Sequence, residues 1–149
     1  MLLHYGNIFA YVSSALIILA IFSLPKRLNR KEIYTTWFVM AAFTINTDLV
    51  LGVVFDLYDF INPDISLNDL VLQFILAPSA GVLVLNFQPK KRIKFILYLS
   101  GVLCFAIFFE WLATLFGYLV YKGWRLWYSI PFYLLGMLYL KWHLNFLRK

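Results

Sequence analysis

Two carboxylic acids, Asp48 and Glu110, lie inside long apolar stretches of the chain. Asp48 belongs to the stretch IYTTWFVMAAFTINTDLVLGVVF, and Glu110 belongs to FILYLSGVLCFAIFFEWLATLFGYLV. A charged side chain at the centre of a bilayer costs roughly 2.5–3.5 kcal/mol on insertion scales, so acids in such stretches usually face the protein interior. There they bind a ligand, carry a proton or join helices by hydrogen bonds. These two acids are therefore the first candidates for a functional site.

The composition indicates whether the chain that carries these acids is surrounded by water or by lipid. The chain has 149 residues, of which 63% are hydrophobic and 13% charged, and its mean hydropathy is +0.80. Soluble domains average about 45–50% apolar and about 25% charged residues. A single globule of this length could not bury so much apolar surface, so the sequence predicts an integral membrane protein with one domain, residues 1–149.

Five apolar segments are long enough to cross a bilayer as helices, at about 20 residues each. Helices are favoured over barrel strands because the apolar runs are continuous and do not alternate with polar residues. We therefore expect an all-α, polytopic membrane fold with five transmembrane helices. The predicted spans are 7–24, 33–55, 70–88, 95–121 and 127–147.

The basic residues predict the orientation of these spans. Eleven of the thirteen lysines and arginines follow the first, third and fifth spans or lie at the end of the fifth, and only Lys122 and Arg125 fall on the other side. Because cytoplasmic loops carry the excess of Lys and Arg, the N-terminus is expected outside and the C-terminus in the cytoplasm. The basic loops are then topology signals and lipid-headgroup contacts, so no nucleic-acid partner is expected.

The helix faces around the acids carry small and polar residues. Thr44 and Gly52 lie four positions from Asp48, and Ala106 and Thr114 lie four positions from Glu110. Small residues let neighbouring membrane helices approach, which favours inward placement of both acids. Counting from the span midpoints puts the two acids roughly 4–6 Å toward the outer face.

Other polar residues fall at a similar depth, among them Gln73 and Tyr133. The sequence thus predicts a polar chamber in the outer half of the membrane, which serves as a ligand-binding or proton site. Its expected lining is Asp48, Glu110, Gln73, Tyr133, Thr44 and Thr114.

Two further features lie on the expected outer side. The residues Asp56, Asp59, Asp64 and Asp69 form an acidic loop between the second and third spans. It lacks the spacing and central glycine of an EF-hand loop, and turn formation and helix capping explain its residue types, so neither a metal nor a cofactor is expected.

An aromatic cluster beyond the fourth span is typical of an interfacial belt. Its members are Tyr118, Tyr121, Trp124, Trp127 and Tyr128.

Several short motifs carry a family resemblance. They are PKRLNRKEIYTTWF, TDLVLGVVFDLYDF, FFEW and YKGWRLWYSIPFY. In their order along the chain they resemble a family of small five-helix membrane proteins of spore-forming Gram-positive bacteria that has no assigned activity. The resemblance implies a multi-pass protein of the bacterial plasma membrane and implies no catalytic residue. A weaker similarity to carotenoid-type lycopene cyclases lacks their paired-acid proline motif, since Glu110 is flanked by Phe109 and Trp111.

Three classes of function follow from these observations. The favoured class is a non-catalytic binding or assembly subunit, with the bilayer, a lipid or small-molecule ligand, a second copy or a membrane partner protein as its contacts. The first alternative is a component of a proton-coupled or small-molecule transporter, for which Pro78 could interrupt the third helix. The second alternative is a membrane enzyme acting on a lipid or isoprenoid, in which a protonated acid would donate a proton. The acids could also be purely structural, holding helices through hydrogen bonds.

Overall fold

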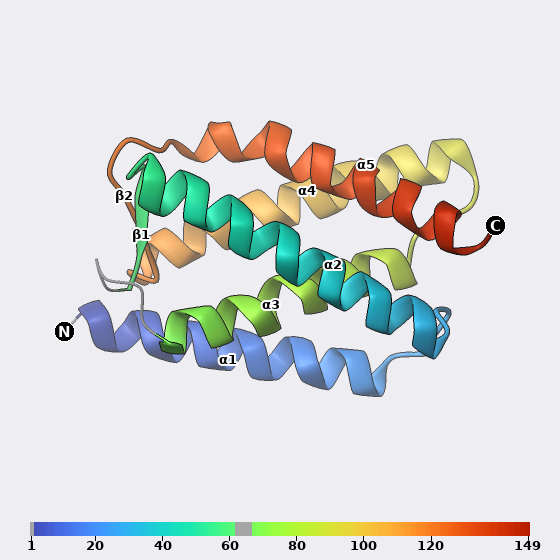
Figure 1. Cartoon of the computed structure of the whole chain (residues 1–149), viewed down its shortest axis with the longest axis horizontal. Coiled ribbons are helices and arrows are strands. Elements are labelled where there is room, and N and C mark those ends of the chain that lie inside the picture. The colour runs from blue at the N-terminus through green and yellow to red at the C-terminus, as the bar shows by residue number, and fades with distance from the viewer. Residues whose placement is uncertain (1, 62–66) are drawn as a thin grey trace.

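Five helices lie side by side along the long axis of the molecule in the computed structural model, which describes residues 2–61 and 67–149 (Figure 1). Successive helices run in opposite directions, so the chain crosses the bundle from end to end. The links between α1 and α2 and between α3 and α4 lie at one end, together with the C-terminus. The helices are α1 (Leu2–Ser23), α2 (Arg30–Asp48), α3 (Leu67–Asn86), α4 (Arg92–Leu115) and α5 (Ser129–Leu147).

Within the described ranges, four helices are long enough and apolar enough to cross a membrane. They are α1, α3, α4, and α2 together with the π-helix η1 (Leu49–Val54) that continues it. The helical membrane architecture expected from the sequence is confirmed to this extent. The remaining helix, α5, has 19 residues and carries Lys141, His143 and Asn145 in its second half.

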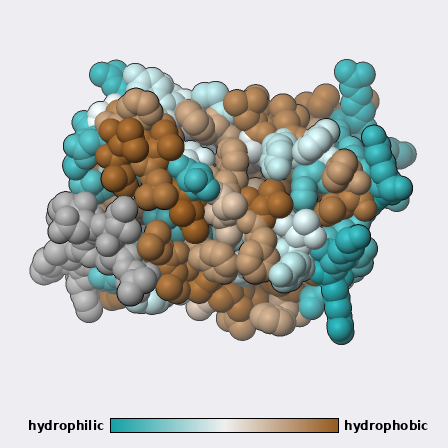
Figure 2. Space-filling view, in the orientation of Figure 1, coloured by the Kyte–Doolittle hydropathy of each residue, from teal (hydrophilic) through white to brown (hydrophobic). Residues whose placement is uncertain are grey.

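Large apolar side chains remain uncovered on the outer faces of the helices. Leu16, Leu97 and Leu135 are 62%, 70% and 65% exposed, respectively. Hydrophobic residues occupy the middle of the molecule in Figure 2, and hydrophilic residues gather toward its two ends. Such a belt is the surface that a protein presents to lipid acyl chains, because water would penalise so much exposed apolar area.

The fourth helix ends earlier than its predicted span. The prediction of one helix over residues 95–121 is wrong at its end, because α4 stops at Leu115 and a turn follows. Gly117 has a φ of 74°, its N–H donates to Thr114, and the N–H of Tyr118 donates to Ala113 at 2.9 Å. These are the paired hydrogen bonds of a Schellman motif, in which glycine adopts the left-handed conformation at low cost.

The segment after α4 contributes to a two-stranded sheet that was not predicted from the sequence. Strand β2 (Leu119–Tyr121) pairs antiparallel with β1 (Tyr58–Phe60), and Tyr58 lies opposite Tyr121. The carbonyl of Leu57 also accepts hydrogen bonds from three successive N–H groups, those of residues 122–124, at 3.0 Å each. The sheet thereby joins the segment after α2 to the segment after α4, and it lies at the end of the bundle opposite the C-terminus (Figure 1).

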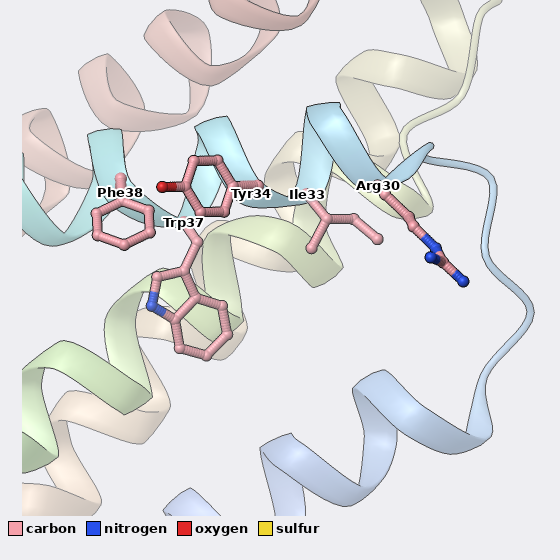
Figure 3. Close-up of a pocket in the computed structure, with 5 residues that line it drawn as sticks. All are labelled: Arg30, Ile33, Tyr34, Trp37 and Phe38. Atoms are coloured by element: carbon pink, nitrogen blue, oxygen red, sulfur yellow. The ribbon is translucent and has the colours of Figure 1, made fainter.

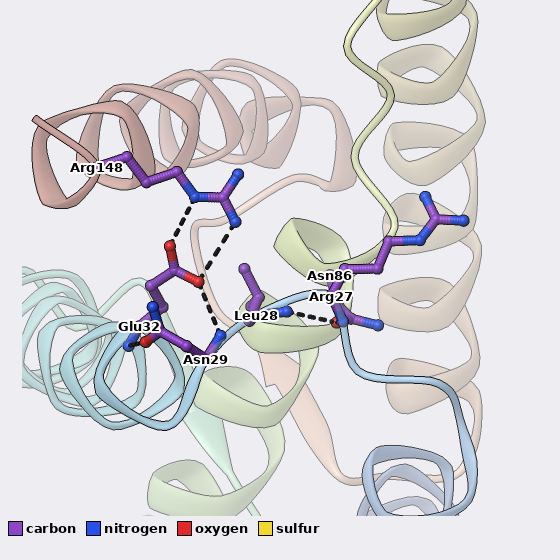
Figure 4. Close-up of polar contacts among 6 residues, drawn as sticks. All are labelled: Arg27, Leu28, Asn29, Glu32, Asn86 and Arg148. Carbon is purple, nitrogen blue, oxygen red and sulfur yellow. Dashed lines mark hydrogen bonds and ion pairs between the residues drawn. The ribbon is translucent and has the colours of Figure 1, made fainter.

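The opposite end of the bundle is held by a separate set of polar contacts (Figure 4). Asn29 and Glu32 form a capping box at the start of α2, and Arg148 donates to the carboxylate of Glu32 at 2.6 Å. The side chain of Asn86 accepts from the N–H groups of Arg27 and Leu28, and it donates to the carbonyl of Pro25. The link between α1 and α2 is therefore fixed to the end of α3, and α5 is fixed to the start of α2.

Candidate functional site

The carboxylate of Glu110 accepts hydrogen bonds from three hydroxyl groups. Tyr121 and Ser129 donate to Oε1, the latter at 2.6 Å, and Tyr133 donates to Oε2 at 2.7 Å. Glu110 is only 6% exposed. The donors come from strand β2, from the first residue of α5 and from the second turn of α5. A carboxylate has about four acceptor positions, so these donors leave little of Glu110 open to another molecule.

A tryptophan extends this network by one step. The indole N–H of Trp124 donates a hydrogen bond to the hydroxyl oxygen of Ser129 at 2.9 Å. The Ser129 hydroxyl in turn donates a hydrogen bond to Glu110. Ser129 is 5% exposed, so its hydroxyl must find partners within the protein. The Trp124 ring lies edge-on to Tyr58, with ring centroids 5.8 Å apart. The segment between β2 and α5 is thus attached both to Glu110 and to the sheet.

Asp48 is held by a different tyrosine. It is the last residue of α2, it is partly buried, and its Oδ1 accepts a hydrogen bond from the Tyr58 hydroxyl at 2.7 Å. Because Tyr58 and Tyr121 are opposite each other in the sheet, adjacent strands supply one donor to each acid. Tyrosines of the sheet therefore connect Asp48 to Glu110, and the described residues show no direct hydrogen bond between the two carboxyl groups.

The phenols of the sheet remain donors over the usual pH range. Burial raises the pKa of Tyr58, and the carboxylate of Asp48 beside it raises the pKa further. Burial and the hydrogen bond to Glu110 likewise raise the pKa of Tyr121 above its ordinary value. Since a tyrosine must lose its proton to stop donating, a raised pKa favours the donor form of both phenols.

The structure places the predicted site residues in different surroundings. Tyr133 reaches Glu110, as expected for residues lining one site. Gln73 is buried in α3 and Thr44 is partly buried in α2, and neither makes a hydrogen bond to an acid within the described part of the chain. The hydroxyl of Thr114 donates to a backbone carbonyl of its own helix, three residues earlier, at 2.7 Å. The predicted outer chamber with all six residues in its lining remains a prediction.

The aspartates of the predicted acidic loop lie in different surroundings. Lys122 lies 2.5 Å from Asp56 and 3.0 Å from Asp59, and hydrogen bonds to these two carboxylates raise the pKa of Lys122. Asp69 is buried in the first turn of α3, and Asp64 lies outside the described residues. The residues with described positions contain no group of three His, Cys, Asp or Glu side chains that could hold a metal ion.

Sequence reasoning missed most of the donors to the two acids. It assigned Tyr121 and Trp124 to an interfacial aromatic belt, whereas the structure places them in the hydrogen-bond network. Tyr58 lay in a loop with no assigned role. Among the donors, only Tyr133 belonged to the predicted lining of the site. Ser129 lies four residues before Tyr133 on the same helix face, and this spacing is a signal that could have found it.

The chain matches no protein-family model, no curated protein and no solved structure. The interpretation of the network therefore rests on its own geometry.

Removing one donor tests whether the network stabilises the fold. We expect Tyr133→Phe to lower the free energy of unfolding by roughly 1–3 kcal/mol, because Glu110 loses a hydrogen bond in a buried setting. Tyr139→Phe is the matched control on the same helix, since Tyr139 is 38% exposed and its hydroxyl has no described partner. That control should change the free energy by less than about 0.5 kcal/mol. Denaturation of both variants in mild detergent measures the difference, and equal effects would contradict the prediction.

Proposed function

We propose that the chain is a five-span protein of the bacterial plasma membrane that acts as a non-catalytic binding or assembly subunit. The observation that supports this best is that three hydroxyls of the chain itself occupy most of the acceptor positions of Glu110. A general acid or a ligand-binding acid needs an oxygen within reach of the bound molecule. At Glu110 the acceptor positions are used to join α4, β2 and α5, which is the role of a structural acid.

The distribution of charge supports an outside N-terminus and a cytoplasmic C-terminus. The links between α1 and α2 and between α3 and α4 lie with the C-terminus at one end of the bundle (Figure 1). Ten of the thirteen lysines and arginines lie in these links, in the first turns of α2 and α4, or after the end of α5. The sheet end carries Lys122, which is paired with acids, and Arg125. Under the positive-inside rule the basic end faces the cytoplasm.

The helix α5 fits as the fifth span. Its 19 residues give a length of about 28 Å, close to the thickness of the hydrocarbon core. Lys141 lies in the half of α5 nearer the basic end, and its ammonium is 3.6 Å from the centroid of the Phe95 ring. A long side chain of this kind can reach the interface while its methylene groups stay among apolar neighbours.

A binding or assembly role fits the small amount of protein outside the helices. The links 24–29 and 87–91 are short, and the sheet and the turns around it form the largest non-helical part that the structure describes. What the molecule offers a partner is therefore mainly its helix surface inside the bilayer. The bacterial location rests on the resemblance of its motifs to the five-helix family of spore-forming bacteria.

A second candidate function is a component of a proton-coupled transporter, and Asp48 favours it. This acid is partly buried, one of its oxygens accepts a hydroxyl from Tyr58, and the π-helix η1 begins at the next residue. Short π-helical segments occur frequently at functional sites. Five helices are few for a lone carrier, so this function would require a second copy or a partner protein.

Surface labelling tests the orientation. With Cys104 first replaced by serine, we expect Arg125→Cys to react with a membrane-impermeant maleimide added to intact cells. Lys90→Cys, in the link between α3 and α4, should react only after the cells are opened. Both native side chains are exposed, so burial does not explain a difference. The reverse pattern would contradict the proposed orientation.

Substitution of each acid tests the two functions. We expect Glu110→Gln to melt at a lower temperature than the wild type, while the lipids and small molecules that co-purify with its folded fraction, identified by mass spectrometry, stay the same. Loss of a specific co-purifying molecule without loss of stability would instead show that Glu110 binds a ligand. A transporter would show solute uptake into vesicles that is driven by a pH gradient. If that uptake is abolished in Asp48→Asn but retained in Thr44→Val, on the same face of α2, the transporter replaces the proposed function.

A further inference from the structure

A groove opens on the side of the bundle near its basic end. Its volume is about 400 Å³, and all of the residues that line it come from the first half of α2. In Figure 3 these side chains project from α2, and that of Trp37 extends over α3. The lining residues are Arg30, Ile33, Tyr34, Trp37 and Phe38.

The groove changes from charged to apolar along its length. Arg30 is the first residue of α2, and Phe38 lies eight residues further into the apolar part of the helix, about 12 Å away along its axis. Phe74 of α3 continues the apolar wall, with its ring centroid 6.5 Å from that of Trp37 and 6.1 Å from that of Phe38. The groove therefore has one cationic end at the membrane surface and an apolar course toward the membrane interior.

The cation at the mouth has no acidic partner among the residues that the structure describes. Glu32 is the acid nearest to Arg30 in the sequence, and it is 5% exposed. Its carboxylate is bound by Arg148 at 2.6 Å and by the backbone N–H of Asn29 at 2.9 Å. The side chain of Arg30 is exposed and forms no ion pair with any described residue. The positive end of the α2 dipole adds to the attraction for an anion at this position.

We propose that this groove binds an anionic phospholipid from the leaflet on the side of the α1–α2 link. The guanidinium of Arg30 contacts the phosphate of the headgroup, since arginine can donate two parallel hydrogen bonds to phosphate oxygens. One acyl chain lies along Ile33, Trp37 and Phe38. An amphiphile is the occupant that matches a cation followed by an apolar wall, whereas a free anion would leave that wall unused. This site lies at the opposite end of the bundle from the network of Glu110. It rests on the proposed membrane location and does not depend on the role proposed for Glu110.

Native mass spectrometry of the full chain in mild detergent tests the proposal. The protein is titrated with phosphatidylglycerol and, separately, with phosphatidylcholine of the same acyl chains. We expect the wild type to bind the first phosphatidylglycerol more tightly than phosphatidylcholine. Arg30→Gln should weaken binding of that first phosphatidylglycerol about fivefold and remove the preference. Lys90→Gln removes the same charge at the same end of the bundle but outside the groove, and it should retain the preference.

Four outcomes would overturn the proposal. An equal loss in Arg30→Gln and Lys90→Gln would show that general positive charge attracts the lipid. An unchanged preference in Arg30→Gln would show that the lipid binds elsewhere. Competition by inorganic phosphate at millimolar concentration would show a free-anion site.

A second variant, Ile33→Trp, fills the groove with a larger side chain. With a melting temperature close to that of the wild type, this variant should bind both lipids more weakly. Unchanged binding would contradict an acyl chain in the groove.

Discussion

A buried carboxylate in an apolar helix bundle must receive hydrogen bonds, and the sheet end of this molecule is organised around that requirement. A carboxyl group without partners would cost several kcal/mol in such surroundings. Glu110 lies in the last two turns of α4, and N–H groups in the middle of a helix are already used within that helix. The donors that the structure describes at Glu110 are three side-chain hydroxyls.

This requirement explains the turn that follows α4. If the helix continued to residue 121, Tyr121 would lie about three turns beyond Glu110 along the axis and could not return to it. The Schellman turn at Gly117 reverses the chain, and β2 then brings the Tyr121 hydroxyl back to the carboxylate. Gly6 of α1 packs on this turn so closely that a Cβ atom there would lie 2.8 Å from the Gly117 carbonyl oxygen. The first helix is thus in contact with the same structure.

The two acids differ in a way that separates their roles. Glu110 has donors on both oxygens and is almost completely buried, whereas Asp48 has a described donor on one oxygen and is more exposed. Regular helix periodicity made the helices and the shared face of Ser129 and Tyr133 predictable. The sheet could not be predicted, because three-residue strands paired between positions 58 and 121 leave no local pattern. Thr114 illustrates a further limit: its place near Glu110 in the sequence is predictable, but its hydroxyl binds its own backbone.

Through its three hydroxyl donors, Glu110 holds the sheet and the start of α5 against the end of α4. Hydrogen–deuterium exchange of the wild type and Glu110→Gln, both in mild detergent, tests this most directly. We expect faster exchange in the variant over residues 57–60 and 118–124, where the backbone donors of the sheet and the adjoining turn lie. Residues 25–32 and 82–86, at the opposite end, should exchange at the wild-type rate. Unchanged exchange in the sheet, or a uniform increase over the whole chain, would show that Glu110 does not hold these segments together.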